Sequence, residues 1–413
     1  MNYLETLDYI NSFTKSGKPV KDLSRIRKLL NLLDNPQKDL KFIHVAGTNG
    51  KGSTVEMISN ALRFSGYDVG TFTSPFMVCY EDRIRFNSEN ISSVDLCKYA
   101  SIVKSFVTTN EFSQFEISMA IAFLYYNAKH CDVVVLETGI GGVVDSTNIV
   151  ENTLVSVITS ISFDHTAILG DTLPKIATQK SGIIKPNRPV VLSNDNTNQE
   201  VIDVISNYAD KQHSRLYIPK VAQIVDTSIH GETFIYNDVL YSLKMLGKHQ
   251  VANASTVIET CDVLNSLGYN ITCDSVKKSL KETQVRFRTE VIQNDDVLII
   301  ADGSHNIGGV TALKDTLKSC NIDNVTILTG MISTKDYKSC CKVLDTIADS
   351  VVCTDDFIYN AIPKEELSKL FTKRVEKSSL NDALNVAKAI TKEEKSVLVV
   401  CGSLYLLSKI FND

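Results

Sequence analysis

The 413-residue sequence lacks several features that would place it in a specialised class of protein. It has no block of Arg or Lys and a formal net charge of −5, whereas a nucleic-acid-binding surface needs a dense cationic face. No uninterrupted apolar stretch approaches the ~18 residues of a membrane span. The N-terminal MNYLETLDYI has no basic region followed by an apolar run. We therefore expect a cytoplasmic protein that binds neither nucleic acid nor membrane.

The ten cysteines include no CxxC pair, which argues against a zinc ribbon or a redox motif and favours free thiols in a reducing compartment. No GxSxG elbow is present, and no Cys/His pair suggests nucleophilic catalysis. With 43% apolar and 22% charged residues, the composition is that of an ordinary globular protein. The length exceeds what one hydrophobic core usually organises, so we expect two domains.

Apolar runs rich in Ile and Val alternate with segments of helical periodicity in the first part of the chain. Phe42–Ala46 and Asp132–Glu137 are predicted strands, and residues 116–130 are predicted to form a helix with Ile117, Ala120, Ile121 and Leu124 on one stripe. This alternation predicts a mainly parallel sheet with helices on both faces. The ends of the two strands, at Gly47 and Glu137, should then lie at the same carboxyl edge.

The pattern changes after Arg215. Short alternating strands predict a small accessory sheet, with a hairpin closed near Asn237 and Asp238. Residues 284–290 have the character of a connector, and a second series of strands follows, at Val297–Ala301, Val325–Leu328, Ser350–Cys353 and Val397–Cys401. The expected fold class is therefore α/β. A boundary near residue 289 is expected to divide the chain into a larger domain, residues 1–288, and a smaller one, residues 289–413.

The most informative string is HVAGTNGKGST, which follows a predicted strand and opens a predicted helix. Its glycines allow backbone N–H groups to turn toward phosphate oxygens, and its lysine can neutralise the terminal phosphates. Either Ser53 or Thr54 could reach a magnesium ion. The alternative is a glycine-rich turn with a solvent-facing lysine. The predicted nucleotide-binding residues in this loop are Gly47, Thr48, Asn49, Gly50, Lys51, Gly52 and Ser53.

A carboxylate follows the strand 132–137 at the predicted sheet edge. Glu137 stands before TGIGGVVDSTN, opposite the phosphate loop, where it is well placed to hold magnesium. Taken alone, a Glu at the end of a strand would be ordinary surface chemistry. Its combination with the loop predicts a metal ligand.

The compact GTNGK loop resembles that of the Mur ligase superfamily, and within it the folylpolyglutamate and dihydrofolate synthases. Matching motifs extend from RIRKLLNLLDNPQ before the loop to CGSLYLLSKI near the end of the sequence. The resemblance implies that residues 1–288 form an ATP-binding central domain of the P-loop type and residues 289–413 a smaller Rossmann-like domain. It also implies an ATP- and magnesium-dependent ligase with two magnesium ions, and catalytic roles for Lys51, Glu137, His165 and Lys180.

The resemblance further implies three metal ligands beyond Ser53 and Glu137. They are Ser74 in TSPF, His165 in SFDHTAILGD and Lys180 in IATQKSGIIKP. A lysine serves as a metal ligand only when carbamylated, because a free ammonium beside magnesium would be repelled. The neighbours Gln179 and Ser181 depart from the family pattern, so an ordinary exposed helix lysine stays an alternative at position 180.

Later motifs match positions that contact ATP in the family. They supply Asn253 in KHQVANA, Arg288 in the connector, and Asp302 and His305 in ADGSHN. Simpler alternatives are a surface amide at Asn253, a solvated linker charge at Arg288 and a helix cap at Asp302.

Two segments resemble the folate site of the family. They supply Phe115 for ring stacking, and Asp145 and Asn148 for contacts to heteroatoms, although packing and turn roles would also suit these three residues. Many bifunctional members carry a histidine and an arginine where this chain has Phe76 and Val143. A third departure is Thr334, where an aspartate is usual.

The expected reaction is the ATP-dependent addition of L-glutamate to the glutamate carboxylate of a reduced folate through an acyl phosphate, by an enzyme expected to be a monomer. One alternative is a bifunctional dihydrofolate synthase/folylpolyglutamate synthase. Another is a different Mur-type amide ligase, although the roughly 40 residues before the loop are too few for a domain that recognises a uridine nucleotide. A non-catalytic nucleotide-binding module would not need Glu137, His165 and Lys180.

Overall fold

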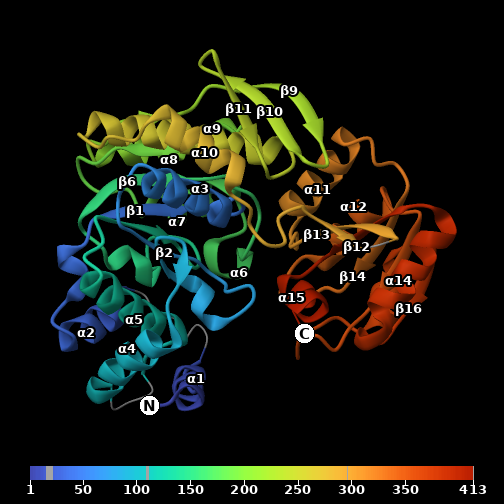
Figure 1. The fold of residues 1–413 in the computed structure, drawn as a ribbon, viewed down its shortest axis with the longest axis horizontal. Coiled ribbons are helices and arrows are strands. Elements are labelled where there is room, and N and C mark those ends of the chain that lie inside the picture. The colour runs from blue at the N-terminus through green and yellow to red at the C-terminus, as the bar shows by residue number, and fades with distance from the viewer. Residues whose placement is uncertain (15–21, 108–110, 295, 413) are drawn as a thin grey trace. The chain divides into compact units, whose positions relative to one another are not determined.

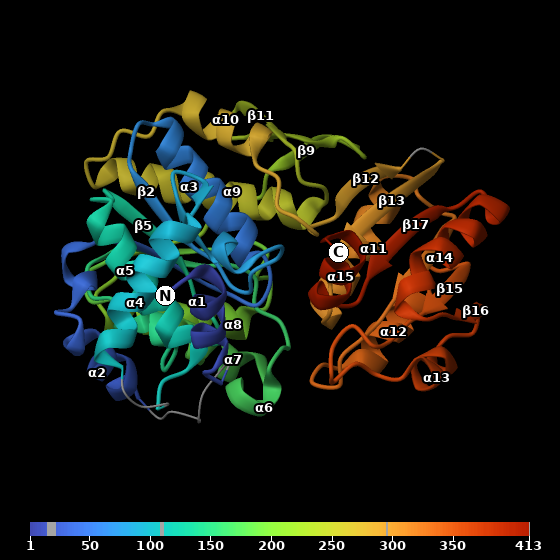
Figure 2. The same cartoon turned by 60° about the horizontal axis from the view of Figure 1, so that its bottom comes forward.

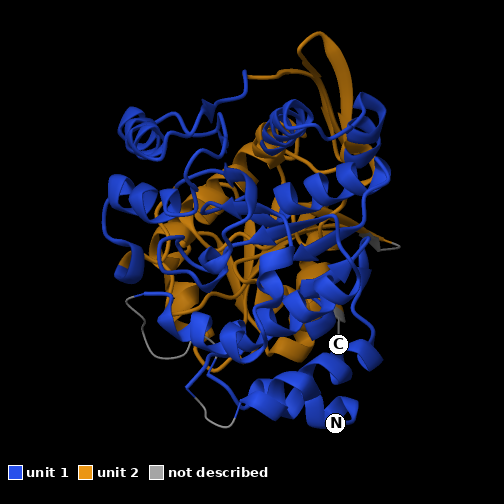
Figure 3. Ribbon diagram, turned by 90° about the vertical axis from the view of Figure 1, so that its left-hand side faces the viewer, with its two compact units in different colours: residues 1–161, 167–220, 253–279 blue, residues 162–166, 221–252, 280–413 orange. Residues whose placement is uncertain are grey.

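The computed structural model describes residues 1–14, 22–107, 111–294 and 296–412 (Figure 1). The chain forms two compact units (Figure 3). The first comprises Met1–Ile161, Ala167–Lys220 and Asn253–Ser279, and the second Ser162–Thr166, Val221–Ala252 and Leu280–Asp413. The second unit thus takes in two segments that precede residue 280, and the division at residues 288 and 289 stays a prediction.

An eight-stranded sheet forms the framework of the first unit, with the order β4-β3-β2-β5-β1-β6-β7-β8. The strands from β2 to β8 in this order are parallel, whereas β3 is antiparallel to β2 and β4 is antiparallel to β3. The predicted mainly parallel sheet is therefore confirmed. The strands are β1 Phe42–Ala46, β2 Val69–Phe72, β3 Ile84–Phe86, β4 Glu89–Asn90, β5 Val133–Glu137, β6 Thr153–Ile158, β7 Val190–Leu192 and β8 Leu216–Tyr217.

Helices cover both faces of this sheet (Figures 1 and 2). Helices α4 and α5 lie on one side, and α3, α9 and α10 on the other. The side chains of Ser275 and Ser279 on α10 donate hydrogen bonds to main-chain carbonyls of α3. The helices are α1 Tyr3–Asn11, α2 Ser24–Leu32, α3 Lys51–Phe64, α4 Ser93–Phe106, α5 Gln114–Ala128, α6 Thr166–Leu169, α7 Leu173–Ser181, α8 Gln199–Lys211, α9 Lys248–Ser266 and α10 Cys273–Glu282, with short 3-10 turns η1 Pro36–Asp39, η2 Tyr80–Arg83 and η3 Ser146–Ile149.

Helix α5 is buried on more sides than its sequence pattern predicted. Its predicted stripe is buried except for Leu124, which is only partly covered, and Phe123 and Tyr126 are buried as well. A capping box at Ser113 and Glu116 begins the helix. A helix surrounded by apolar partners needs no polar face, so a single stripe understates its burial.

The second unit contains two sheets. A three-stranded antiparallel sheet has the order β11-β10-β9, and its predicted hairpin is confirmed, with Asn237 and Asp238 both at positive φ between β10 and β11. A six-stranded sheet has the order β12-β13-β17-β14-β15-β16, parallel except for the edge strand β12. The strands are β9 Gln223–Ser228, β10 Gly231–Tyr236, β11 Val239–Leu243, β12 Glu290–Asn294, β13 Val297–Asp302, β14 Val325–Thr329, β15 Ser350–Cys353, β16 Arg374–Lys377 and β17 Val397–Cys401.

Helices of the second unit pack on the six-stranded sheet, and the apolar side chains between helices and sheet form the core of this unit. Buried residues such as Ile300, Ile327, Val351 and Val399 belong to one apolar cluster. The helices are α11 Ile307–Ser319, α12 Tyr337–Asp345, α13 Lys364–Leu367, α14 Leu380–Glu394 and α15 Leu404–Asn412, with the short turn η4 Ser368–Leu370. The predicted fold class is confirmed. Within the described part of the chain, no helix is both long and apolar enough to cross a membrane.

A buried ion pair joins α2 to the start of α5 and provides a test of the packing. Arg25 Nε donates to both Glu116 oxygens, at 2.9 and 2.8 Å, and the side chains are 13% and 1% exposed. We expect Arg25→Met to lower the free energy of unfolding by about 3 kcal/mol, because it leaves a buried carboxylate without its cation.

The control is Lys28→Met on the same helix, whose pair with Glu111 is 58% and 39% exposed. This change should cost less than about 1 kcal/mol. Urea unfolding of the two variants measures both values, and equal losses would contradict the assignment.

Candidate active site

The phosphate loop connects β1 to α3 in a conformation that requires two of its glycines. Gly47 has φ +153° and Gly50 has φ +84°. A Cβ atom on Gly47 would lie 1.7 Å from Thr159 Oγ1, and one on Gly50 would lie 2.5 Å from Asn253 Oδ1. A Cβ atom on Gly52 would meet only Glu137 Oε2, at an ordinary 3.8 Å. The close approach of neighbouring side chains therefore explains the glycines at positions 47 and 50.

Residues after β6 hold this loop in place. Thr159 Oγ1 donates to the Asn49 carbonyl at 2.7 Å, and the Ser160 carbonyl accepts from Thr48 N–H at 2.7 Å. Strand β6 ends at Ile158, just before these two residues. Thr159 and Ser160 leave the sheet to pair with the loop. The sequence analysis missed them as site residues, and only their position beside the loop reveals their role.

Lys51 and Glu137 lie at the same edge of the sheet, as predicted. The parallel pairing of β1 with β5 places Val45 opposite Glu137. Lys51 Nζ donates to the Gly47 and Thr48 carbonyls, at 3.2 Å each, and lies 4.0 Å from Glu137 Oε1. Glu137 is 4% exposed, and its Oε2 accepts from Ser74 N–H at 3.2 Å. A cation and a carboxylate thus stand together beside the phosphate loop.

The oxygen atoms near this loop fit a magnesium ion. Within the described residues, Ser53 Oγ and Thr54 Oγ1 are buried and have no hydrogen-bond partner. Both are on the first turn of α3, and Gly52 on the same turn faces the Glu137 carboxylate. Magnesium prefers such hard oxygen ligands and is usually held by one or two carboxylates together with substrate phosphates. No group of three His, Cys, Asp or Glu side chains within the described ranges could hold a metal ion by itself.

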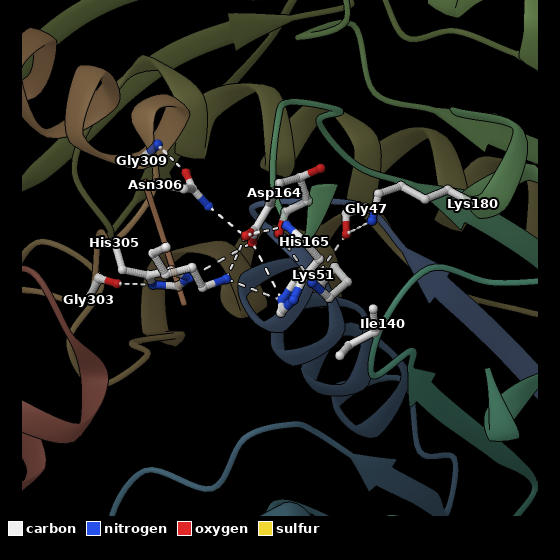
Figure 4. A network of polar contacts seen from close by, with 12 residues as sticks. Gly47, Lys51, Ile140, Asp164, His165, Lys180, Gly303, His305, Asn306 and Gly309 are labelled. Atoms are coloured by element: carbon white, nitrogen blue, oxygen red, sulfur yellow. Dashed lines mark hydrogen bonds and ion pairs between the residues drawn. The ribbon is translucent and has the colours of Figure 1, made fainter. Parts of the chain in front are cut away.

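Lys180 is a buried residue, so the alternative of an exposed helix lysine is wrong. It lies in the last turn of α7 with 3% of its surface exposed, and its Nζ donates to the Gly47 carbonyl at 2.6 Å. Figure 4 shows Lys180 and Lys51 both directed at Gly47. The structure therefore brings Lys180 to the phosphate loop. Asn253 is likewise 4% exposed, which excludes the surface-amide alternative.

Two of the predicted folate residues meet around Gly139. A Cβ atom on Gly139 would lie 3.1 Å from both Phe115 Cζ and Asp145 Oδ2. The ring of Phe115 is half-buried and packs edge-on against Phe72. Asp145 accepts hydrogen bonds from Ile140 N–H and from the main chain and hydroxyl of Thr147. Burial raises the pKa of Asp145, and these hydrogen bonds act in the opposite direction.

In the second unit, Asp302 organises the turn after β13. Its Oδ2 accepts from the main chain and hydroxyl of Thr289, at 2.8 and 2.9 Å, and its Oδ1 accepts from Ser304 N–H. The helix-cap alternative is wrong for Asp302, because Asn306 caps α11. Arg288 is half-buried near this turn, and its charge helps to lower the pKa of His305.

The segment at Asp164 and His165 groups with the second unit, where it meets a cation that the sequence analysis did not identify. Asp164 Oδ1 accepts from Lys335 Nζ at 2.5 Å, and Lys335 Nζ lies 3.2 Å from His165 Nε2. Asn306 donates to Asp164 at 3.4 Å, and His305 Nε2 lies 4.0 Å from it (Figure 4). His165 is thus grouped with the second unit, whereas the other predicted metal ligands are grouped with the first.

Charge in this cluster is set by burial and by Lys335. Burial alone would raise the pKa of Asp164, but Lys335, His165 and His305 hold it well below its usual range. Burial, with Lys335 acting in the same direction, lowers the pKa of His305 to about 4. His305 is therefore neutral at pH 7, and its Nδ1–H donates to the Gly303 carbonyl at 2.8 Å.

Comparison with known proteins gives matches along nearly the whole chain. Residues 45–261 match the Mur ligase middle domain, and residues 287–404 match the Mur ligase glutamate ligase domain. The chain is 31% identical to a folylpolyglutamate synthase of Lacticaseibacillus casei and 34% identical to a dihydrofolate synthase/folylpolyglutamate synthase of Bacillus subtilis, in each case over 99% of this chain and 98% of the relative. A crystal structure of Mycobacterium tuberculosis folylpolyglutamate synthase complexed with ADP and AMPPCP has a TM-score of 0.85 at 26% identity, covering 94% of each chain. The resemblance inferred from the motifs is confirmed.

Two glycines of the phosphate loop, Gly47 and Gly52, should respond differently to a methyl group. Gly47→Ala is expected to lower the melting temperature by about 4 °C or more, because its Cβ atom collides with Thr159 and its φ disfavours a side chain. Gly52→Ala, in the same loop, meets no close atom and should leave the melting temperature nearly unchanged. Thermal melting monitored by circular dichroism measures both, and similar losses would show that the loop is not constrained as described.

Proposed function

This chain belongs to the Mur ligase family, and we propose that it acts as a folylpolyglutamate synthase that adds L-glutamate to the glutamate carboxylate of a reduced folate. The observation that carries the proposal is the phosphate loop, with Lys51 and Glu137 together at the edge of a parallel sheet. The full-length similarity to folylpolyglutamate synthases supports the choice of substrates. The enzyme is an ATP-dependent ligase, which we place in the cytoplasm as a monomer.

The reaction proceeds in two transfers. An oxygen of the folate carboxylate attacks the γ-phosphorus of ATP, the bond to the β-γ bridging oxygen breaks, and ADP leaves. The amine of L-glutamate then attacks the carbonyl carbon of the acyl phosphate, loses a proton, and expels inorganic phosphate as the amide forms. Lys51 offsets negative charge at the phosphates, and the main-chain N–H groups of residues 47–53 orient them.

Magnesium would be held in this site by Ser53 or Thr54 together with Glu137. When bound, it supplies positive charge that neutralises phosphate oxygens. Ser74, His165 and Lys180 are the further ligands that we propose, Lys180 as a carbamate, and two ions would account for the set. The Ser74 main chain contacts Glu137, and Lys180 contacts Gly47, so both residues lie beside the phosphate loop.

The remaining substrate contacts are also proposals. Asn253 adjoins Gly50, so it would contact the nucleotide from the side of α9. Arg288, Asp302 and His305 are the nucleotide contacts that we propose in the second unit. Phe115 would stack on a ring of the folate, and the loop that carries Asp145 and Asn148 would line the same site.

A substrate assay tests the proposal against its alternatives. Purified protein is incubated with ATP, L-glutamate and either tetrahydrofolate, dihydropteroate or a UDP-linked peptidoglycan precursor, and products are identified by mass spectrometry. We expect that tetrahydrofolate is extended and that the other two acceptors are not, since Phe76 and Val143 depart from the bifunctional pattern. Turnover of dihydropteroate would establish the bifunctional alternative. Turnover of the UDP-linked acceptor alone would overturn the proposal.

Removing the Glu137 charge should weaken magnesium binding. Glu137→Gln keeps the shape of the side chain, and we expect it to raise the magnesium concentration for half-maximal activity about 10-fold or more. His165→Ala should act in the same direction if His165 binds a second ion. Magnesium titrations of turnover measure the effect, with the exposed Glu200→Gln as control. Titration curves that superimpose on the wild type would remove Glu137 from the metal site.

Substitutions of Lys180 distinguish a carbamylated lysine from an ordinary ammonium at this position. Arginine cannot form a carbamate, so Lys180→Arg and Lys180→Ala should both lose nearly all activity, and added acetate should partly restore Lys180→Ala by supplying an oxygen ligand. Initial rates with and without acetate are compared, together with the intact mass of the wild type. A largely active Lys180→Arg enzyme whose wild-type counterpart lacks the carbon dioxide adduct would refute the carbamate.

A further inference from the structure

The loop at residues 139–148 is packed tightly against the turn that ends α7. A Cβ atom on Gly142 would lie 2.5 Å from the Gln179 carbonyl, and one on Gly182 would lie 2.5 Å from Val143 Cγ2. Val143 N–H donates to the Gln179 carbonyl at 2.9 Å. The loop that carries Asp145 therefore rests on the same turn of helix that carries Lys180.

One lysine and one amide connect these two segments. Lys185 Nζ donates to the main-chain oxygen of Asn148 at 3.0 Å and to its Oδ1 at 2.8 Å. Asn148 Nδ2 donates to the Val143 carbonyl at 3.2 Å and to the Gly182 carbonyl at 3.0 Å. Both amide hydrogens of Asn148 are thus used within the protein, and its Oδ1 faces a cation. This arrangement suits a residue that holds the loop better than one that reads a ligand.

A buried chain of hydrogen bonds links the same loop to the sheet. Thr147 Oγ1 donates to Asp145 Oδ1 at 2.5 Å, so at 2.8 Å it accepts from the Nε2–H of His44 on β1. Burial lowers the pKa of His44 well below its usual value, and the nearby charge of Lys185 adds to the effect. A neutral His44 with hydrogen on Nε2 therefore fixes Thr147, and Thr147 fixes Asp145.

Lys185 is itself partly desolvated. Burial lowers its pKa to about 8, although the Glu151 carboxylate acts in the opposite direction. A hydrogen bond from an ammonium in a site of low polarity is worth more than one at the surface. Its loss would leave two oxygens of Asn148 without their donor, close to the point where the loop meets Gly182.

We propose that Lys185 is a positioning residue for the ligation reaction, and that it acts through Asn148 to hold the loop 139–148 in the conformation that receives the folate. The inference rests on the proposed function. It assigns Asn148 to the support of the site in place of a direct folate contact. It also assigns a role to Lys185, which lies five positions after Lys180 and donates both of these hydrogen bonds to Asn148.

A double-mutant cycle tests the inference in the full-length enzyme. Lys185→Met and Asn148→Ala are made singly and together, and KM is measured separately for tetrahydrofolate and for ATP. Each single change should raise the KM for tetrahydrofolate by about fivefold or more and leave the KM for ATP within about twofold. The double variant should be no worse than the poorer single variant, because both changes remove the same support. Lys211→Met, an exposed lysine at the end of α8, is the matched control.

The outcomes separate this inference from the proposed function. Independent, multiplying effects of the two changes would overturn it, as would lower melting temperatures with both KM values unchanged. If the wild type does not ligate glutamate, the proposed function fails by itself. Hydrogen exchange then tests the support directly, since Lys185→Met should speed exchange within residues 139–148 relative to Lys211→Met. Equal exchange in that segment would overturn the inference.

Discussion

The parallel pairing of β1 with its two neighbours sets the geometry of the candidate site. On one side, Val45 lies opposite Glu137 of β5, so the phosphate loop and the carboxylate leave the sheet at the same level. On the other side, Ala46 lies opposite Ile158 of β6, which places Thr159 and Ser160 against the loop. Because these segments pack closely at the carboxyl ends of the strands, the loop needs glycine at positions 47 and 50. A one-residue change of register would separate Lys51 from Glu137, and the loop would lose its anchor.

Much of the framework could be predicted because it depends on local pattern. Buried parallel strands appear as Ile- and Val-rich runs, and β1, β15 and β17 match their predicted bounds. The hairpin at Asn237 and Asp238 follows from turn chemistry. The edge strands β8, β12 and β16 were missed, because short edge strands carry little apolar signal. Among the site residues, Lys51 and Glu137 could be predicted because they belong to local sequence patterns. Thr159, Lys185 and Lys335 could not. Their roles arise from contacts between distant segments, and even Lys185, which lies within the IATQKSGIIKP string, has no chemistry that the string alone reveals. The burial of Lys180 and Asn253 also depends on tertiary packing.

In the second unit, an ion pair with little exposure directly follows a departure from the family pattern. Thr334 stands where an aspartate is usual, but the next residue, Lys335, is well covered and paired with Asp164. The neutral His305 and the amide of Asn306 complete the surroundings of that carboxylate without adding net charge. Asp164 therefore stays ionised at neutral pH with one ammonium as its main partner. Fixed pairs of this kind keep the side chains around them in one orientation, which a nucleotide contact at His305 would require.

The central claim is that the folate carboxylate is activated as an acyl phosphate. It is tested most directly by following oxygen from a tetrahydrofolate substrate whose terminal carboxylate carries oxygen-18. When the enzyme turns over this substrate with ATP and L-glutamate, one labelled oxygen should pass to inorganic phosphate for each amide bond formed, because that oxygen bridges carbon and phosphorus in the intermediate. Mass spectrometry of the released phosphate gives the answer. Unlabelled phosphate accompanying amide formation, or label recovered in AMP, would contradict the account.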